Sequence, residues 1–206
     1  MAIIESGVRA PEGSQVLKSM FEARKRIFVD LLKWDVPVLD GRFEVDQFDN
    51  SHATYIILAD QNGHHLGSAR LLETTRPHIL GTLFPELCSG PVPSGPDVLE
   101  ITRFCLDRAL GASDRLQVRN RLVSALVAHA LRSGIRTYTG VAEMSWLQQI
   151  LAFGWDCRPL GLPRNISGRL IGALAISIEP DTPALLNRNR IWCDEDVAET
   201  ALPQAA

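Results

Sequence analysis

The chain has 206 residues, a net charge of −3 and a hydrophobic content of 46%. This length and composition are ordinary for one globular domain, and we predict a single domain over residues 1–206. No apolar run approaches the roughly 18 residues that cross a bilayer, and no export signal is visible at the N-terminus. The four cysteines are scattered without a Cys-x-x-Cys pair, which argues against a zinc site or disulfide framework and favours a cytoplasmic protein.

The first predicted element is an amphipathic helix over residues 15–32, because its apolar residues fall on one arc at about 100° per residue. Arg24 interrupts that arc, so it either snorkels to an edge or reaches a buried anion. Residues 33–52 are predicted to be a loop, and loops of this length are commonly functional. This loop contains Trp34 and the acidic stretch 44–49, Glu-Val-Asp-Gln-Phe-Asp.

The remaining chain alternates between strand and helix patterns. A turn at 60–63 separates predicted strands at 53–59 and 67–72. Further predicted elements are strands at 98–106, 135–141 and 169–178, helices at 114–133 and 143–153, and a loop at 85–96. The tail after Pro180 shows little pattern. This order predicts an α/β sandwich with a central mixed sheet flanked by helices.

Two charged residues, Glu100 and Arg103, interrupt the apolar strand at 98–106. Burying a charge costs several kcal/mol unless it is paired, so these residues indicate either an ion-pair network or a site. Strict alternation puts them on opposite faces of the strand, so they share a site only if a bulge intervenes.

The segment 103–136 is basic, with seven arginines against two aspartates. It is either a solvated helix face or a docking surface for an acidic partner or phosphates. Nucleic acid is disfavoured because the segment lacks interleaved aromatic residues and the whole chain is acidic. The five histidines have no metal-ligand spacing, so no metal is expected.

An ordered set of short motifs resembles the acyl-homoserine-lactone synthases, the LuxI-type autoinducer synthases, over residues 15–180. The motifs are Arg24, Phe28, Trp34, the acidic stretch 44–49, Arg70 in Ser-Ala-Arg-Leu-Leu, Thr74-Thr75-Arg76-Pro77, Leu83-Phe84-Pro85-Glu86, Glu100-Ile-Thr-Arg103-Phe104, Gly154-Trp155 and Leu160-Gly161. The chain departs from the usual family pattern at Glu73, where proline is common, and at residues 146–149, where many members have an arginine-rich turn. The second departure leaves the identity of the acyl donor open. The resemblance implies a GNAT-like acyltransferase fold and a bulge in the strand at 98–106.

The resemblance also implies a two-substrate reaction. The amine of S-adenosylmethionine attacks an acyl-carrier-protein or acyl-CoA thioester, and lactonisation then releases methylthioadenosine and an N-acyl-homoserine lactone. Both reactants are substrates, so no cofactor is expected. A carboxylate suits the proton acceptor, with Glu100 the first candidate and Asp46 the second, and Arg70 is grouped with them as catalytic.

The expected S-adenosylmethionine site combines aromatic and charged side chains. Phe28 and Trp34 suit the sulfonium, because aromatic rings attract cations. Arg24 and Arg103 suit either the substrate carboxylate or the acidic stretch. The full set is Arg24, Phe28, Trp34, Asp46, Asp49, Arg103 and Phe104.

The expected acyl pocket lies around the strand at 135–141 and consists of Ile101, Thr139, Gly140, Val141 and Leu147. Neighbouring strand residues face opposite ways, so only one of Thr139 and Gly140 faces the acyl chain. Counting back from Gly154 favours Gly140, which leaves no hydroxyl there and predicts an unsubstituted acyl chain.

Several alternatives stay open. An acetyl-CoA-dependent N-acetyltransferase would need a glycine-rich turn for the pyrophosphate, and residues 110–115 contain one glycine. A non-enzymatic sensor of S-adenosylmethionine would bind without turnover. Asp46 and Asp49 could be turn formers, and Arg70 with Glu100 a structural ion pair. No nucleophile elbow is present, so a covalent acyl-enzyme is disfavoured.

Overall fold

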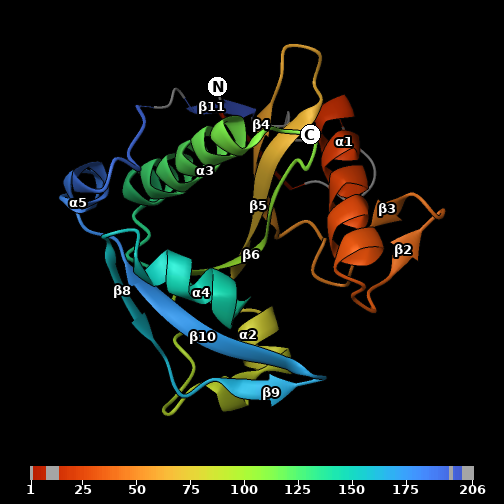
Figure 1. Ribbon diagram of the computed structural model, residues 1–206. Helices are drawn as coiled ribbons and strands as arrows, with labels where there is room; N and C mark the ends of the chain where they lie inside the picture. The colour runs from red at the N-terminus through yellow and green to blue at the C-terminus, as the bar shows by residue number, and fades with distance from the viewer. Residues whose placement is uncertain (1, 8–13, 195–196, 201–206) are drawn as a thin grey trace, which may run out of the picture. The chain divides into compact units, whose positions relative to one another are not determined.

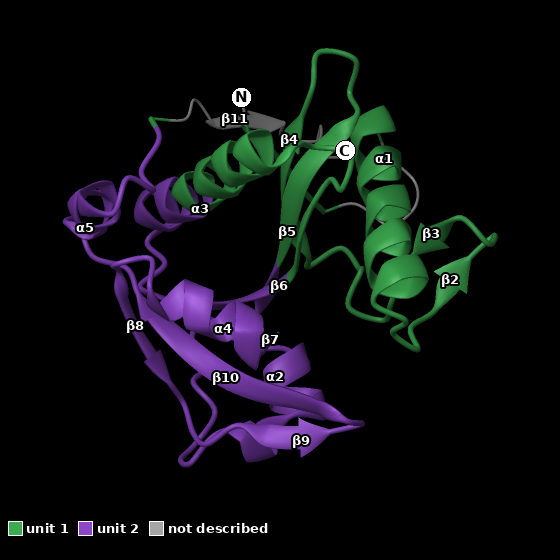
Figure 2. Cartoon of the chain, in the orientation of Figure 1, with its two compact units in different colours: residues 1–70, 103–125, 194–206 green, residues 71–102, 126–193 purple. Residues whose placement is uncertain are grey.

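The computed structural model describes residues 2–7, 14–194 and 197–200. The chain forms two compact units, and Figure 2 colours them separately. Unit 1 comprises residues 1–70, 103–125 and 194–206, and unit 2 comprises 71–102 and 126–193. Each unit is assembled from separate stretches of chain, so neither is a contiguous domain, and the single domain expected over 1–206 stays a prediction.

Unit 1 is built on strands β1 (Ala2–Ser6), β4 (Thr54–Ala59) and the first part of β5 (His65–Glu73), and Figure 1 labels β4 and β5. Strand β1 pairs antiparallel with β4 and parallel with β11 (Val197–Thr200). The predicted turn at 60–63 joins β4 to β5, and Gly63 adopts the left-handed φ of 77° that the turn requires. Helix α3 (Ala112–Ser133) begins in this unit.

The helix predicted over 15–32 changes type in its middle. It is an α-helix, α1, over Gln15–Arg24 and a π-helix, η1, over Lys25–Leu31. Helix α1 buries Leu17, Met20 and Phe21 as the amphipathic pattern predicted. A π-helix holds more residues per turn than the 3.6-residue pattern assumes, so the periodicity could not reveal it. Such segments occur frequently at functional sites.

The predicted loop at 33–52 contains a short antiparallel hairpin of β2 (Val38–Leu39) and β3 (Phe43–Glu44). Strand β3 ends on Glu44, whose side chain is fully buried. The acidic stretch therefore starts inside a paired strand and continues into turns at Asp46–Asp49 and Asn50–Ala53. This anchoring fixes carboxylates that a flexible loop would leave in solvent.

Unit 2 contains a mixed sheet in the order β6-β7-β10-β8, with β9 also paired to β10. The parallel register of β6 with β7 ends at Ile101 and Gly140, although both strands continue. The strands are the first part of β6 (Val98–Leu106), up to Thr102, with β7 (Thr137–Glu143), β8 (Asp156–Pro159), β9 (Arg164–Ile166) and β10 (Arg169–Ser177).

The helices of unit 2 are α2 (Ile79–Leu83), the 3₁₀ turn η2 (Pro85–Leu87), α4 (Met144–Leu151) and α5 (Thr182–Arg188). The sequence did not predict α2 or α5, which are too short to show a helical period. None of the helices in the described residues is long and apolar enough to span a membrane.

Candidate active site

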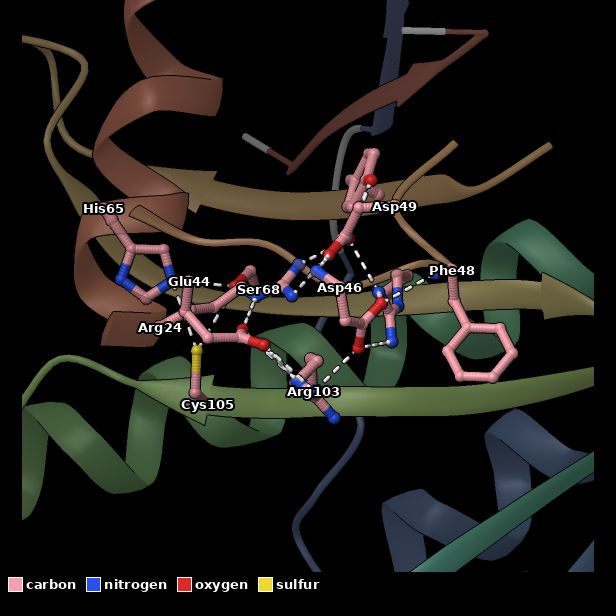
Figure 3. A network of polar contacts seen from close by, with 11 residues as sticks. Arg24, Glu44, Asp46, Phe48, Asp49, His65, Ser68, Arg103 and Cys105 are labelled. Atoms are coloured by element: carbon pink, nitrogen blue, oxygen red, sulfur yellow. Dashed lines mark hydrogen bonds and ion pairs between the residues drawn. The ribbon is translucent and has the colours of Figure 1, made fainter. Parts of the chain in front are cut away.

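Six charged side chains form one buried network in unit 1, shown in Figure 3. Three are guanidinium groups and three are carboxylates, so the network is balanced in charge. The members are Arg24, Arg70, Arg103, Glu44, Asp46 and Asp49. Burying so many ions is expensive unless each charge meets its opposite, and this balance is what makes the network possible.

Arg24 pairs with buried anions, which decides between the two alternatives left by the sequence. Its Nε donates to Glu44, and its Nη1 and Nη2 donate to the two oxygens of Asp49 at 2.7 and 2.8 Å. The Arg24 side chain is 1% exposed, so it does not snorkel. A bidentate contact of this kind fixes the direction of both groups.

Asp49 is the central anion of the network. Besides Arg24, its carboxylate accepts hydrogen bonds from the Tyr55 hydroxyl at 3.0 Å and the Asp46 backbone N–H at 2.8 Å, and it lies 2.7 Å from Arg70. Burial alone would raise the pKa of Asp49, but Arg24 and Arg70 together hold it well below its usual range. With its side chain fully buried among protein donors, Asp49 is suited to orienting the arginines rather than to touching a substrate.

Asp46 connects the second and third arginines. Both of its oxygens accept from Arg70, at 2.6 and 3.0 Å, and Oδ2 also accepts from Arg103 at 2.7 Å. The backbone N–H of Phe48 donates to Oδ1 at 2.8 Å. These contacts occupy its oxygens, so Asp46 is better placed to hold guanidinium groups than to accept a proton. The Arg70 side chain is fully buried against Asp46 and Asp49.

Arg103 joins the network to an aromatic pair. Its Nη2 donates to Glu44 at 2.9 Å, and its guanidinium carbon lies 5.4 Å from the ring centre of Phe28 and 5.6 Å from that of Trp34. The two rings stack with centres 4.7 Å apart. Phe28 belongs to the π-helix η1, and the Trp34 backbone N–H donates to the Phe28 carbonyl at 2.9 Å. The aromatic pair expected to hold a sulfonium therefore already carries a cation.

The strand β6 departs from regular alternation at Arg103, as the sequence argument required. Arg103 has a φ of 51°, a left-handed conformation that is uncommon for a residue with a side chain. Glu100, Thr102 and then Cys105 are buried, so the alternation slips by one residue after Thr102. Strain of this kind persists where surrounding contacts hold it in place, and the pairs with Glu44 and Asp46 do so here. Phe104 is half-buried in the same stretch.

A polar cluster that the sequence did not single out lies in the same unit. His65 Nε2 is 2.9 Å from Ser68 Oγ, and Ser68 Oγ is 3.4 Å from Cys105 Sγ. Figure 3 labels all three residues. Burial raises the pKa of Cys105 to about 11 and lowers that of His65 to about 4. The cysteine is therefore a thiol beside a neutral imidazole, and it is not an activated nucleophile. The members of this polar cluster come from two separate strands, so no sequence motif could have revealed them.

His65 should make the protein less stable as the pH falls. The unfolded chain takes up a proton on this residue near pH 6.5, whereas the folded one resists until about pH 4. The contribution is complete above pH 6.5 and declines between these values, by about 3 kcal/mol in all. We expect His65→Gln to flatten this decline in urea unfolding measured over the same range. His64→Gln is the matched control, because His64 is 71% exposed, and an equal flattening there would contradict burial as the cause.

Glu100 belongs to unit 2 and is fully buried. Its Oε1 accepts a hydrogen bond from the backbone N–H of Leu80 in α2 at 2.9 Å. In the parallel register, Glu100 lies opposite Thr139, so both side chains are on one face of the sheet. The Thr139 hydroxyl is fully buried on that face and has no hydrogen-bond partner among the described residues.

The expected acyl-pocket residues divide between the two faces of the unit 2 sheet. Thr139 and Val141 share the face of Glu100, where Val141 packs near the buried cluster of Leu80, Leu87 and Ala173. Ile101 and Gly140 lie on the other face. Ala142 lies on the same face as Gly140 and pairs with Gly172 of β10. A Cβ on Gly172 would lie 2.8 Å from the side chain of Leu147, so this residue of α4 covers that second face. The five residues therefore do not line one surface.

Gly140 has a structural explanation. A Cβ at this position would come within 3.3 Å of the backbone oxygen of Ile101, at the last paired position between β6 and β7. The sequence argument placed Gly140 rather than Thr139 beside the acyl chain. The register instead puts Thr139 on the face that carries Glu100.

Comparison with known proteins identifies the family. Residues 11–182 match the family model described as autoinducer synthase. An acyl-homoserine-lactone synthase from Ralstonia nicotianae is 38% identical over 189 residues, which cover 89% of this chain and 91% of that protein.

A solved structure similar to this chain is BjaI, a CoA-dependent acyl-homoserine lactone synthase with S-adenosylmethionine and isopentyl-CoA. It has a TM-score of 0.86 and 27% identity, covering 98% of this chain and 94% of its own. An acyl-CoA N-acyltransferase from Pseudomonas aeruginosa, 14% identical with a TM-score of 0.61 over 85% of this chain and 97% of its own, shares the fold alone. These matches confirm the predicted GNAT-like acyltransferase fold, and the chain belongs to the autoinducer synthase family of acyl-homoserine-lactone synthases.

Proposed function

We propose that the ion network of unit 1 with its aromatic pair binds S-adenosylmethionine, and that Glu100 is the proton acceptor for acyl transfer. The charge-balanced network beside Phe28 and Trp34 carries this assignment. It offers guanidinium groups for the carboxylate of this substrate and aromatic faces for its sulfonium. A generic N-acetyltransferase would have no use for this combination.

The reaction proceeds in two displacements. The substrate amine forms a bond to the thioester carbonyl carbon, the carbon–sulfur bond breaks, and the amine proton passes to a carboxylate. The substrate carboxylate then attacks its own γ-carbon, and the bond from that carbon to the sulfonium breaks, so methylthioadenosine leaves as a neutral thioether. The enzyme itself forms no covalent bond, in keeping with the protonated thiol of Cys105.

Glu100 suits the proton transfer better than Asp46 does. The oxygens of Asp46 are held by two arginines, whereas the contact shown for Glu100 is a neutral backbone N–H. Oxygens that already accept from two guanidinium groups are less available for a proton from the substrate. The hydrogen bond from Leu80 also fixes the orientation of the carboxylate without neutralising it.

The acyl donor is a thioester on an acyl carrier protein or on CoA, and both locate the reaction in the cytoplasm. The basic segment that begins at Arg103 is suited to an acidic carrier or to CoA phosphates. One of its arginines has a structural role, since Arg115 donates to the carbonyls of Arg108 and Leu110 at 2.9 and 3.1 Å. These hydrogen bonds hold the loop before α3 in place, so a docking role would belong to the other arginines of the basic segment.

Mass spectrometry of the purified protein tests the function. With S-adenosylmethionine and a panel of acyl-CoA and acyl-carrier thioesters, we expect an N-acyl-homoserine lactone and methylthioadenosine in equal amounts. An acetylated amine formed from acetyl-CoA without methylthioadenosine would support the N-acetyltransferase alternative, and binding without turnover would support the sensor. The same analysis tests the acyl chain. The sequence predicts an unsubstituted chain, and a dominant 3-oxo product would instead assign to the pocket the Thr139 hydroxyl, which has no hydrogen-bond partner in the described part of the chain.

A further inference from the structure

The aromatic pair that suits a sulfonium is already occupied by a cation of the protein itself. The Arg103 guanidinium carbon lies 5.4 and 5.6 Å from the ring centres of Phe28 and Trp34. Its side chain is 8% exposed, so it fills this position instead of extending into solvent. A sulfonium cannot take the same aromatic surface while the guanidinium remains there.

The charges around Arg103 set a condition on any exchange. Glu44 and Asp46 both accept from Arg103, at 2.9 and 2.7 Å, and both are almost fully buried. The network holds three positive and three negative side chains, so removing Arg103 alone would leave it with a net charge of −1 in a buried place. A departing guanidinium must therefore be replaced by another cation.

We propose that Arg103 is an exchangeable internal cation, which yields its place on Phe28 and Trp34 to the sulfonium of S-adenosylmethionine. This inference rests on the proposed binding of that substrate in unit 1. The exchange preserves the charge balance of the network, because one positive group replaces another beside Glu44 and Asp46. The displaced guanidinium is then available for the substrate carboxylate, which it can bind through two parallel hydrogen bonds.

The exchange gives the site a way to distinguish substrate from product. Methylthioadenosine is neutral, so it cannot compensate Glu44 and Asp46 after the sulfonium bond has broken. The return of Arg103 to the rings then favours release of the thioether. The left-handed backbone of Arg103, with a φ of 51°, is a local conformation of higher energy, and breaking the pairs with Glu44 and Asp46 removes contacts that hold it.

The experiment measures the preference for a sulfonium over a thioether. Calorimetric dissociation constants are determined for S-adenosylmethionine and for S-adenosylhomocysteine, which differ by one methyl group and one charge. Both ligands carry the same carboxylate, so loss of a carboxylate contact cancels in their ratio. In Arg103→Met the sulfonium meets vacant rings and an uncompensated negative charge, and we expect the preference for S-adenosylmethionine to rise by about 3- to 30-fold.

Two further variants keep the result interpretable. Arg42→Met is the matched control, because Arg42 also lies over a ring, 5.1 Å from the centre of Phe43, but pairs with Glu22 outside the network. Its ratio should equal that of the wild type. Arg103→Lys retains the charge but not the planar stacking, so it should raise the ratio by a smaller factor, and it serves if Arg103→Met does not fold.

The outcomes separate this inference from the proposed function. If the wild type binds neither ligand, the assignment of S-adenosylmethionine to unit 1 is wrong and the exchange is rejected with it. If the wild type binds S-adenosylmethionine but the ratio is unchanged in the folded Arg103 variants, the sulfonium lies elsewhere and only the exchange is rejected. An equal rise in Arg42→Met would likewise overturn it, since the effect would then reflect net charge alone.

Discussion

Glu100→Gln should lower kcat by about 10²- to 10⁴-fold, the usual contribution of a general base. The amide keeps the shape of the side chain and can still accept the hydrogen bond from the Leu80 N–H through its oxygen. It cannot take up the proton that the attacking amine loses. The chemical step should therefore slow while the fold and the affinity for S-adenosylmethionine persist, which stopped-flow or steady-state assays with calorimetric binding will separate.

Glu143→Gln is the control for this experiment. Glu143 is the last residue of β7 and pairs with Arg169 at 2.7 Å, with side chains 39% and 32% exposed. An exposed pair contributes little, so kcat should change by less than about threefold. A near-normal kcat in a folded Glu100→Gln variant would show that Glu100 does not accept the proton. If circular dichroism shows that the variant is unfolded, the role of Glu100 is structural.

Arg24→Met should both abolish lactone synthesis and destabilise the fold. The substitution keeps the length of the side chain but leaves Glu44 and Asp49 buried without their main cation. Breaking one partner of a buried ion pair typically costs about 3–5 kcal/mol, because the remaining charge is uncompensated. Urea unfolding at neutral pH measures this loss directly. A loss this large is a substantial part of the stability of a domain.

Two variants test whether charge, and not packing, causes the loss. The double variant Arg24→Met/Glu44→Gln restores the charge balance, so it should recover at least about 1 kcal/mol relative to the single variant. Arg26→Met is the control, because Arg26 lies two residues further along the chain, in η1, and its side chain is 53% exposed beside Glu22. This substitution should lower the free energy of unfolding by less than about 1 kcal/mol. A double variant less stable than Arg24→Met would show that packing of the long side chain matters more than its charge.

The amino-acid sequence was enough to predict the order of the main elements, and it singled out charged residues that the fold brings together in one buried network. Periodicity gave the strand at 98–106 with its observed bounds and α3 to within two residues, because these elements are long enough to repeat their pattern. The interrupted apolar arc at Arg24 identified a buried charge. The ordered motifs predicted the family, and the match of residues 11–182 to the autoinducer synthase model confirms it.

Which charges pair with which could be read only from the folded chain. Residues 24, 44, 46, 49, 70 and 103 are spread over 80 positions, and no local pattern pairs a given arginine with a given carboxylate. The π-helix that carries Phe28 and the left-handed backbone at Arg103 were likewise invisible, because contacts with distant residues stabilise them against local preference. The face of the sheet on which Thr139 lies was also invisible in the sequence. A shift of one residue in the register moves every side chain of a strand to the other face, and pairing with the neighbouring strand sets that register.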